Sequence, residues 1–160
     1  MRGFALHRAI FMERVDLMKK DFYLTGKYQN KACRIEAQCH RKTPSIQVEL
    51  RAANGSVMPI TQNLGSIMPP YRCILADGLI GPGKEDFMEY VEQNDLGYIV
   101  DYKRFDYDVF TGHPRRLAVV FQFNPKRLRE LDPMGCKRYE KHSAKLLRHL
   151  HEAREARKAG

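Results

Sequence analysis

The sequence lacks any run of about 18 apolar residues, the length that a membrane-spanning helix requires. The N-terminal segment also lacks the apolar region and the small-residue cleavage site of a secretory signal. We therefore expect a cytoplasmic protein without a membrane partner.

Cysteine is sparse, with four residues and no Cys-x2-Cys pair, so the spacing disfavours a zinc site. Cys33 and Cys39 fall in an alternating stretch that places both on one strand face beside Ile35 and Ala37. Free cysteine is among the most buried residue types, which favours thiols that serve as small apolar side chains. We expect no metal and no cofactor.

Catalytic patterns are also missing, since no nucleophile elbow and no Ser-His-Asp order stands out. The stretch HEARE, residues 151–155, begins like a zinc-binding helix but has Glu155 where a second histidine would be required. Asp77, Asp101 and His113 fall singly in or near loops. The sequence therefore favours a protein that is not an enzyme.

The stretch ADGLIGPGKEDF, residues 76–87, places Gly78, Gly83 and Lys84 at the glycine and lysine positions of a phosphate-binding loop. Glu85 occupies the position where a Ser or Thr hydroxyl would bind magnesium, and Pro82 removes one amide. A nucleotide site is therefore disfavoured. A weaker anion site remains, formed by the amides of Gly83 and Lys84 at a helix start.

Alternation of apolar and polar residues predicts antiparallel strands between about residues 20 and 123. Residues 22–28, 33–39, 45–52 and 57–64 are candidate strands, with a hairpin turn at Asn54-Gly55 and Pro59 at a sheet edge. Residues 97–110 and 115–123 predict a second hairpin, and residues 84–94 a covering helix with Phe87, Tyr90 and Val91 inward. The predicted fold class is α+β, with a mainly antiparallel sheet.

The last segment changes character, because Asn124-Pro125 and Asp132-Pro133 each cap a predicted helix. The second helix is expected to run to about Ala156 and to dock on the sheet through an apolar stripe, namely Tyr139, Leu146, Leu147, Leu150 and Ala153. We divide the 160-residue chain into residues 1–17, an α+β domain at 18–123 and a basic helical arm at 124–160. Residues 1–17 form either a short amphipathic helix or a translated leader that ends before Met18.

The basic arm is the most informative feature of the chain. Residues 125–160 hold 11 Lys plus Arg against 5 Asp plus Glu, so +6 of the total +9 lies there. The candidate nucleic-acid-binding residues are Arg127, Arg129, Lys137, Arg138, Lys141, Lys145 and Arg148, with Tyr139 and His142 able to stack or hydrogen-bond. The pattern resembles no sequence-reading helix and no aromatic RNA-binding signature.

Two alternatives to nucleic-acid binding remain open. The same charge could bind an acidic protein surface, as in an interaction module or an inhibitor of a host enzyme from a mobile element. A more distant alternative is a phosphate- or nucleotide-binding enzyme.

Between about Ser45 and Phe121 the chain resembles small uncharacterised α+β domains encoded on phage and plasmid elements. The resemblance rests on Asn54-Gly55, Thr61, Asn63 and Leu64, because those domains have a strand, a glycine turn and a Thr-x-Asn-Leu strand end before a helix. The resemblance implies an accessory protein of a mobile element and supplies no catalytic residues.

Overall fold

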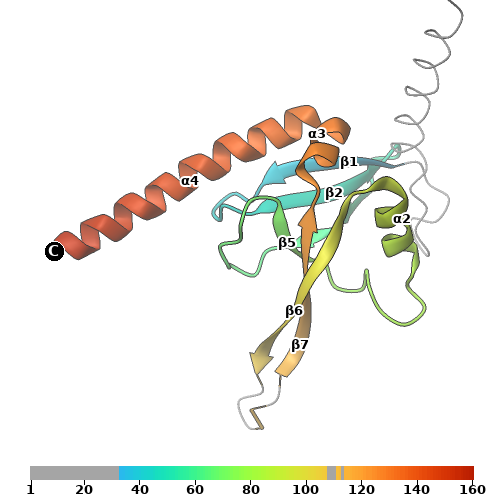
Figure 1. Cartoon of the computed structure of the whole chain (residues 1–160), viewed down its shortest axis with the longest axis horizontal. Helices are drawn as coiled ribbons and strands as arrows, with labels where there is room; N and C mark the ends of the chain where they lie inside the picture. Colours follow the sequence, from blue (N-terminus) through green and yellow to red (C-terminus); the bar gives the residue numbers. More distant parts are fainter. Residues whose placement is uncertain (1–32, 108–110, 113) are drawn as a thin grey trace, which may run out of the picture.

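The computed structural model describes residues 33–107, 111–112 and 114–160 (Figure 1). The predicted segment 1–17, the predicted strand at 22–28 and residues 108–110 of the second hairpin lie outside the described residues. The described residues form three helices and two antiparallel sheets, which confirms the predicted α+β class with a C-terminal helix.

The first sheet has the order β1 (Cys33–Cys39), β2 (Ile46–Ala52) and β3 (Val57–Pro59). The predicted alternation is confirmed, because Ile46, Val48 and Leu50 are buried while the residues between them are half-exposed. The Asn54 side chain accepts a hydrogen bond from the Ser56 amide in the turn between β2 and β3. Pro59 lies in the edge strand, as predicted, where a missing amide breaks no ladder bond.

The predicted strand at residues 57–64 is interrupted at Ile60 and serves both sheets. The Ile60 amide donates to the Val48 carbonyl in the first sheet, and the Ile60 carbonyl accepts from the Ala76 amide beside the second. β4 (Thr61–Gln62) then pairs with β5 (Arg72–Leu75). The Thr61 Oγ1 accepts a buried hydrogen bond of 3.0 Å from the Val48 amide, so a side chain completes the ladder where the backbone leaves it.

The second sheet has the order β4, β5, β7 (Pro114–Phe123) and β6 (Gly97–Tyr107), with every neighbouring pair antiparallel. The predicted second hairpin is confirmed as β6 and β7. β5 pairs with β7 only as far as Val120, so the outer part of the hairpin continues as a two-stranded ribbon away from the body (Figure 1).

α2 (Asp86–Asn94) is the predicted covering helix, and Phe87, Tyr90 and Val91 are buried as expected. The helix ends through Asp95 in the left-handed conformation, which aspartate tolerates better than most residues. Gly97, predicted to end this helix, has a different role. A β-carbon there would lie 2.0 Å from the Gln122 carbonyl oxygen, so its absence allows β6 to approach β7.

The inner faces of both sheets, α2 and the start of the C-terminal helix share one hydrophobic core, in which Val48 and Phe121 are completely buried. Cys39 is a buried free thiol, as predicted, and so are Cys73 and Cys136, whereas the side chain of Cys33 lies outside the described residues. Burial raises the pKa of the Cys136 thiol to about 11, so this thiol is protonated at neutral pH. The cysteines fill space in the core.

The hydroxyl of Thr61 gives a test of the corner between the sheets. Thr61→Val keeps the shape but leaves the buried Val48 amide without an acceptor, so we expect a loss of about 1–3 kcal/mol in the free energy of unfolding. Thr61→Ser keeps the acceptor and should lose less. Urea unfolding followed by circular dichroism measures both, and equal stability of Thr61→Val and the parent protein would contradict the assignment.

Candidate nucleic-acid interface

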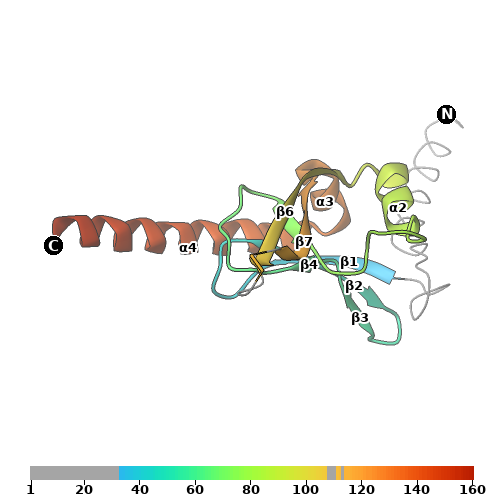
Figure 2. The ribbon, with the colours of Figure 1, turned by 90° about the horizontal axis from the view of Figure 1, so that it is seen from below.

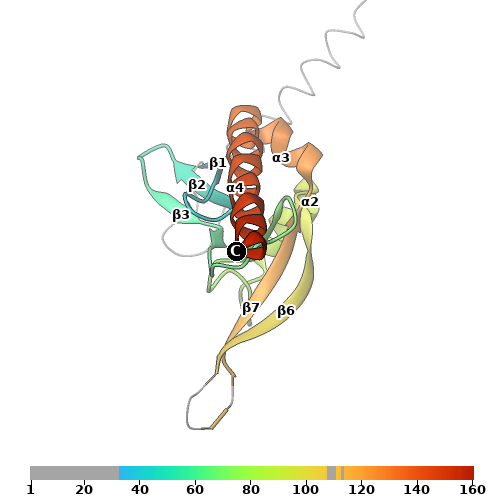
Figure 3. The ribbon, with the colours of Figure 1, turned by 90° about the vertical axis from the view of Figure 1, so that its left-hand side faces the viewer.

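α3 (Pro125–Leu131) and α4 (Pro133–Ala159) form the predicted basic arm. Within the described residues, it is the first half of α4 that packs on the body, through Gly135, Cys136, Tyr139 and Ser143. Beyond Leu146 every residue of the helix is exposed, and α4 projects away from the sheets as a straight rod (Figure 2) that points toward the viewer in Figure 3.

The predicted docking stripe is therefore correct only in part. Tyr139 is buried and Leu146 packs against the core, whereas Leu147 and Leu150 are 44% and 45% exposed. Ala153 is fully in solvent as well. The apolar stripe continues beyond the part of α4 that packs on the described strands. Spacing along the helix predicts the stripe but not the point at which this packing ends.

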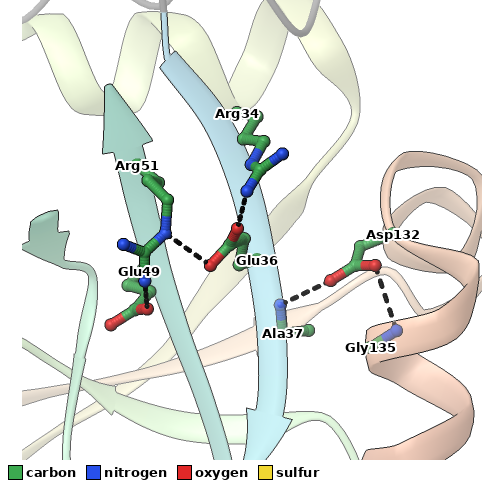
Figure 4. A network of polar contacts seen from close by, with 7 residues as sticks. All are labelled: Arg34, Glu36, Ala37, Glu49, Arg51, Asp132 and Gly135. Carbon is green, nitrogen blue, oxygen red and sulfur yellow. Dashed lines mark hydrogen bonds and ion pairs between the residues drawn. The ribbon is translucent and has the colours of Figure 1, made fainter. Parts of the chain in front are cut away.

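The origin of α4 is fixed by Asp132, the predicted cap (Figure 4). One carboxylate oxygen accepts from the Gly135 amide at 3.0 Å, and the other accepts from the Ala37 amide on β1 at 2.9 Å. A β-carbon on Gly135 would lie 2.0 Å from the Asp132 carboxylate and 2.3 Å from the Ala37 carbonyl oxygen. The helix start and the edge strand are therefore in direct contact.

Asn124, the other predicted cap, makes no cap bond with its side chain. Its side-chain amide donates to Asp95 instead.

A second contact holds α4 further along, at Tyr71. This residue has a left-handed backbone (φ 62°), which is uncommon for a bulky side chain. Its amide donates to the Tyr139 hydroxyl at 3.0 Å, and its ring meets the Tyr139 ring edge-on at 5.0 Å. Its hydroxyl donates to Glu140, and burial together with this bond raises the pKa of the Tyr71 hydroxyl. The sequence pattern gave only a loop rich in glycine and proline at this position, so the role of Tyr71 was missed.

Two of the seven predicted phosphate-binding residues take part in these internal contacts. Arg129 pairs with Glu140 at 2.7 Å and lies over the Tyr71 ring. Arg127 pairs with Glu130 and donates to the Asn94 carbonyl at 3.1 Å. Binding a phosphate at either guanidinium would compete with these bonds.

The other five predicted residues lie together on α4 and are all exposed. They make no ion pair with any described residue, and they are Lys137, Arg138, Lys141, Lys145 and Arg148. Because an α-helix has 3.6 residues per turn, they fall within an arc of about 100° on the side opposite the buried residues. They span roughly 16 Å of the helix axis, and Glu152 and Glu155 follow on the same side. We call these five residues the basic face.

The predicted aromatic contribution to this face is wrong for Tyr139. Its ring is 2% exposed and packs on Tyr71, so it cannot stack on a base. His142 is half-buried beside the basic face.

A polar hollow of about 380 Å³ lies between β1 and the junction of α3 with α4, with Arg34 and Arg138 at its lining. Three carboxylates line it too, on Glu36, Glu49 and Asp132. Glu36 and Glu49 already pair with arginines of the first sheet (Figure 4). The carboxylates disfavour phosphate inside the hollow, which leaves the open basic face as the anion-attracting surface.

The loop containing Gly83 and Lys84 lies outside this surface. The Lys84 amide donates to the Gly81 carbonyl at 3.0 Å, so the turn itself uses one of the two amides of the predicted anion site. The preceding strand β5 is antiparallel to both neighbours, which is not the sheet context of a phosphate-binding loop. Among the described residues no three His, Cys, Asp or Glu side chains are grouped to hold a metal ion, His151 and Glu155 included. Nor does any helix of the described ranges have the length and apolarity to cross a membrane.

No family model, no curated protein and no solved structure matches this chain. What the described residues offer is an anchored helix with a row of cations that have no ion-pair partner among them, and this row is suited to bind a polyanion without reading its sequence.

The stabilisation that Glu140 gives to the contact between α4 and Tyr71 is expected to depend on pH. The hydrogen bond from Tyr71 and the pairing with Arg129 lower the pKa of this carboxyl. A lowered pKa in the folded state stabilises the fold above the pKa of the unfolded chain, near 4.3, and this stabilisation is lost as the pH falls through the folded value. We expect Glu140→Gln to lower the thermal midpoint at pH 7, with the difference from the parent protein shrinking at more acidic pH. Glu152→Gln, on the same helix and without a described partner, is the control. A Glu140→Gln deficit that does not change with pH would show that the charge has no role.

Proposed function

We propose that this protein is a small non-enzymatic accessory protein that binds nucleic acid through the basic face of α4. The observation that carries the proposal is that five exposed cations share one side of an anchored helix and are not paired within the described chain. Each phosphate that a cation neutralises releases counterions, which is a large part of the driving force for binding DNA or RNA.

The anchored half of α4 favours this function over a merely solvated helix. Asp132, Tyr71 and Glu140 fix the helix at two places, so Lys137 and Lys141 are presented from a rigid segment. A rigid row of cations loses less conformational entropy on binding than the same charges on a flexible tail. Arg127 and Arg129 belong to the anchor in this proposal and contribute to binding only indirectly.

The alternative is an interaction module that binds an acidic protein surface, for instance a host enzyme that it inhibits. The exposed Leu147 and Leu150 favour it, because they lie on the other side of the projecting half of α4, with Arg154 and Arg157 beside them. Under this alternative the apolar side of the helix would bind the partner. The accessory role on a mobile element, which the resemblance implies, is compatible with both functions.

Salt dependence tests the proposed function. We expect the logarithm of the binding constant for duplex DNA to fall linearly with the logarithm of salt concentration, and the double variant Lys141→Ala, Lys145→Ala to lower that slope by about two units. The matched control is Arg154→Ala, Arg157→Ala, which removes the same charge from the opposite side of the helix. Fluorescence anisotropy titrations at several salt concentrations measure all three proteins.

Equal slope changes in both double variants would mean that only total charge matters and would contradict a specific basic face. If the unmutated protein binds no nucleic acid but retains a single partner from nuclease-treated lysate, and Leu150→Asp abolishes that retention, the interaction module is the correct function.

A further inference from the structure

The ribbon formed by β6 and β7 carries a second exposed surface, which shares no residue with the basic face. Strand pairing places Tyr102 across from Val119 and Arg104 across from Leu117. The bulge between Ile99 and Asp101 sets this register. Tyr102 and Arg104 therefore lie on the same face of the ribbon as Phe121, which is closer to the core along β7. Tyr102 is 51% exposed and Leu117 is 57% exposed.

The side chains of Tyr102 and Arg104 are uncommitted. Neither forms an ion pair, a ring contact or a side-chain hydrogen bond within the described residues. The nearest carboxylate along the strand, that of Asp101, accepts a hydrogen bond from the Tyr102 backbone amide at 2.7 Å. Asp101 lies on the opposite face of the ribbon from Tyr102. One aromatic ring and one guanidinium plane therefore follow each other along one face, with Leu117 beside them.

The spacing of the two positions along β6 suits a nucleobase between their side chains. Residues two apart on an antiparallel strand lie about 6.8 Å from each other on the same face. This is twice the roughly 3.4 Å spacing of bases along a nucleic-acid strand, so one flat base fits between the ring and the guanidinium. Tyrosine rings and arginine planes are the groups on which proteins stack unpaired bases. A base inside a duplex is already stacked on both sides and cannot enter.

We propose that Tyr102 and Arg104 form a slot for one unpaired base, which makes single-stranded nucleic acid the preferred ligand class. This inference rests on the proposed function, because the slot adds stacking to the phosphate contacts of α4. Both residues lie on the outer part of the ribbon, opposite Val119 and Leu117, where β7 pairs with β6 and no longer with β5 (Figure 1).

The test compares a fluorescein-labelled oligothymidylate with a duplex of the same length by anisotropy titration. We expect the unmutated protein to bind the single strand more tightly, and Tyr102→Ala to weaken single-strand binding at least about fivefold with an unchanged salt slope, since stacking releases no counterions. Tyr102→Phe keeps the ring and should retain the affinity. Binding of the duplex should change little in either variant.

Two matched controls lie on the same strand but on the opposite face. Tyr98 is 59% exposed, and Tyr98→Ala should leave binding unchanged. Lys103→Ala removes one positive charge from the other face, as Arg104→Ala does from the slot. Both variants lower the salt slope, but only Arg104→Ala should lose more single-strand affinity than the loss of one charge explains. Circular dichroism confirms that each variant is folded.

The outcomes separate this inference from the proposed function. If Tyr102→Ala binds the single strand as tightly as the parent protein while Lys141→Ala, Lys145→Ala loses affinity, the slot is refuted and the basic face stands. A preference for the duplex also refutes the slot. If the unmutated protein binds neither ligand, both proposals fall.

Discussion

The position of the whole C-terminal arm depends on one carboxylate, that of Asp132. Its two oxygens join the first turn of α4 to the amide of Ala37 on the outer edge of β1. No described strand would otherwise accept from that amide, because β1 pairs with β2 alone among the strands of the described residues. A single side chain therefore caps the helix, covers the sheet edge and sets the direction in which α4 leaves the body. Gly135 is required beside it, since no side chain fits between the carboxylate and β1.

The second contact, around Tyr71, holds α4 further along the helix and so fixes its direction at a second point. Tyr71 adopts a conformation that is strained for a tyrosine, and the surrounding bonds to Tyr139, Glu140 and the amide of Phe123 hold it there. Arg129 closes the cluster over the Tyr71 ring. Charged residues that belong to such a cluster stabilise the fold, whereas Lys137 and Lys141, one turn apart on the outer side, pair with no described residue. The basic segment therefore divides into charges that hold the fold together and charges that the described part of the chain leaves unpaired.

Local pattern was sufficient for much of the fold and for part of the site. Alternation in residues 46–52 and the spacing of Phe87, Tyr90 and Val91 report burial directly, because each element presents one face to the core. The corner at Ile60 was missed, since the hydrogen bonds made there join residues on different strands: the Ile60 amide donates to the Val48 carbonyl, and the Val48 amide donates to the Thr61 hydroxyl. The ion pair of Arg129 with Glu140 was also beyond the pattern, because it requires the turn between α3 and α4 to bring the two helices together. The pair of Arg127 with Glu130 is different, since residues three apart are neighbours on one helix. Charge density along a sequence does not reveal which charges are paired.

The distribution of buried residues also separates the part of α4 that supports the core from the part that does not. The buried face of α4 ends near Leu146, and beyond it the helix no longer contributes to the core. Substitutions beyond that point are therefore expected to have little influence on stability, so the fold constrains the composition of the projecting half only weakly. The ribbon formed by β6 and β7 differs, because past Val120 the β7 residue Ala118 is still 2% exposed and Val119 packs against the core. Substitutions of these two residues are therefore expected to cost stability, whereas Leu117 and Tyr102, at 57% and 51% exposure, can vary with less effect on the fold. In both projections the boundary between core and solvent falls within a single helix or strand rather than between elements.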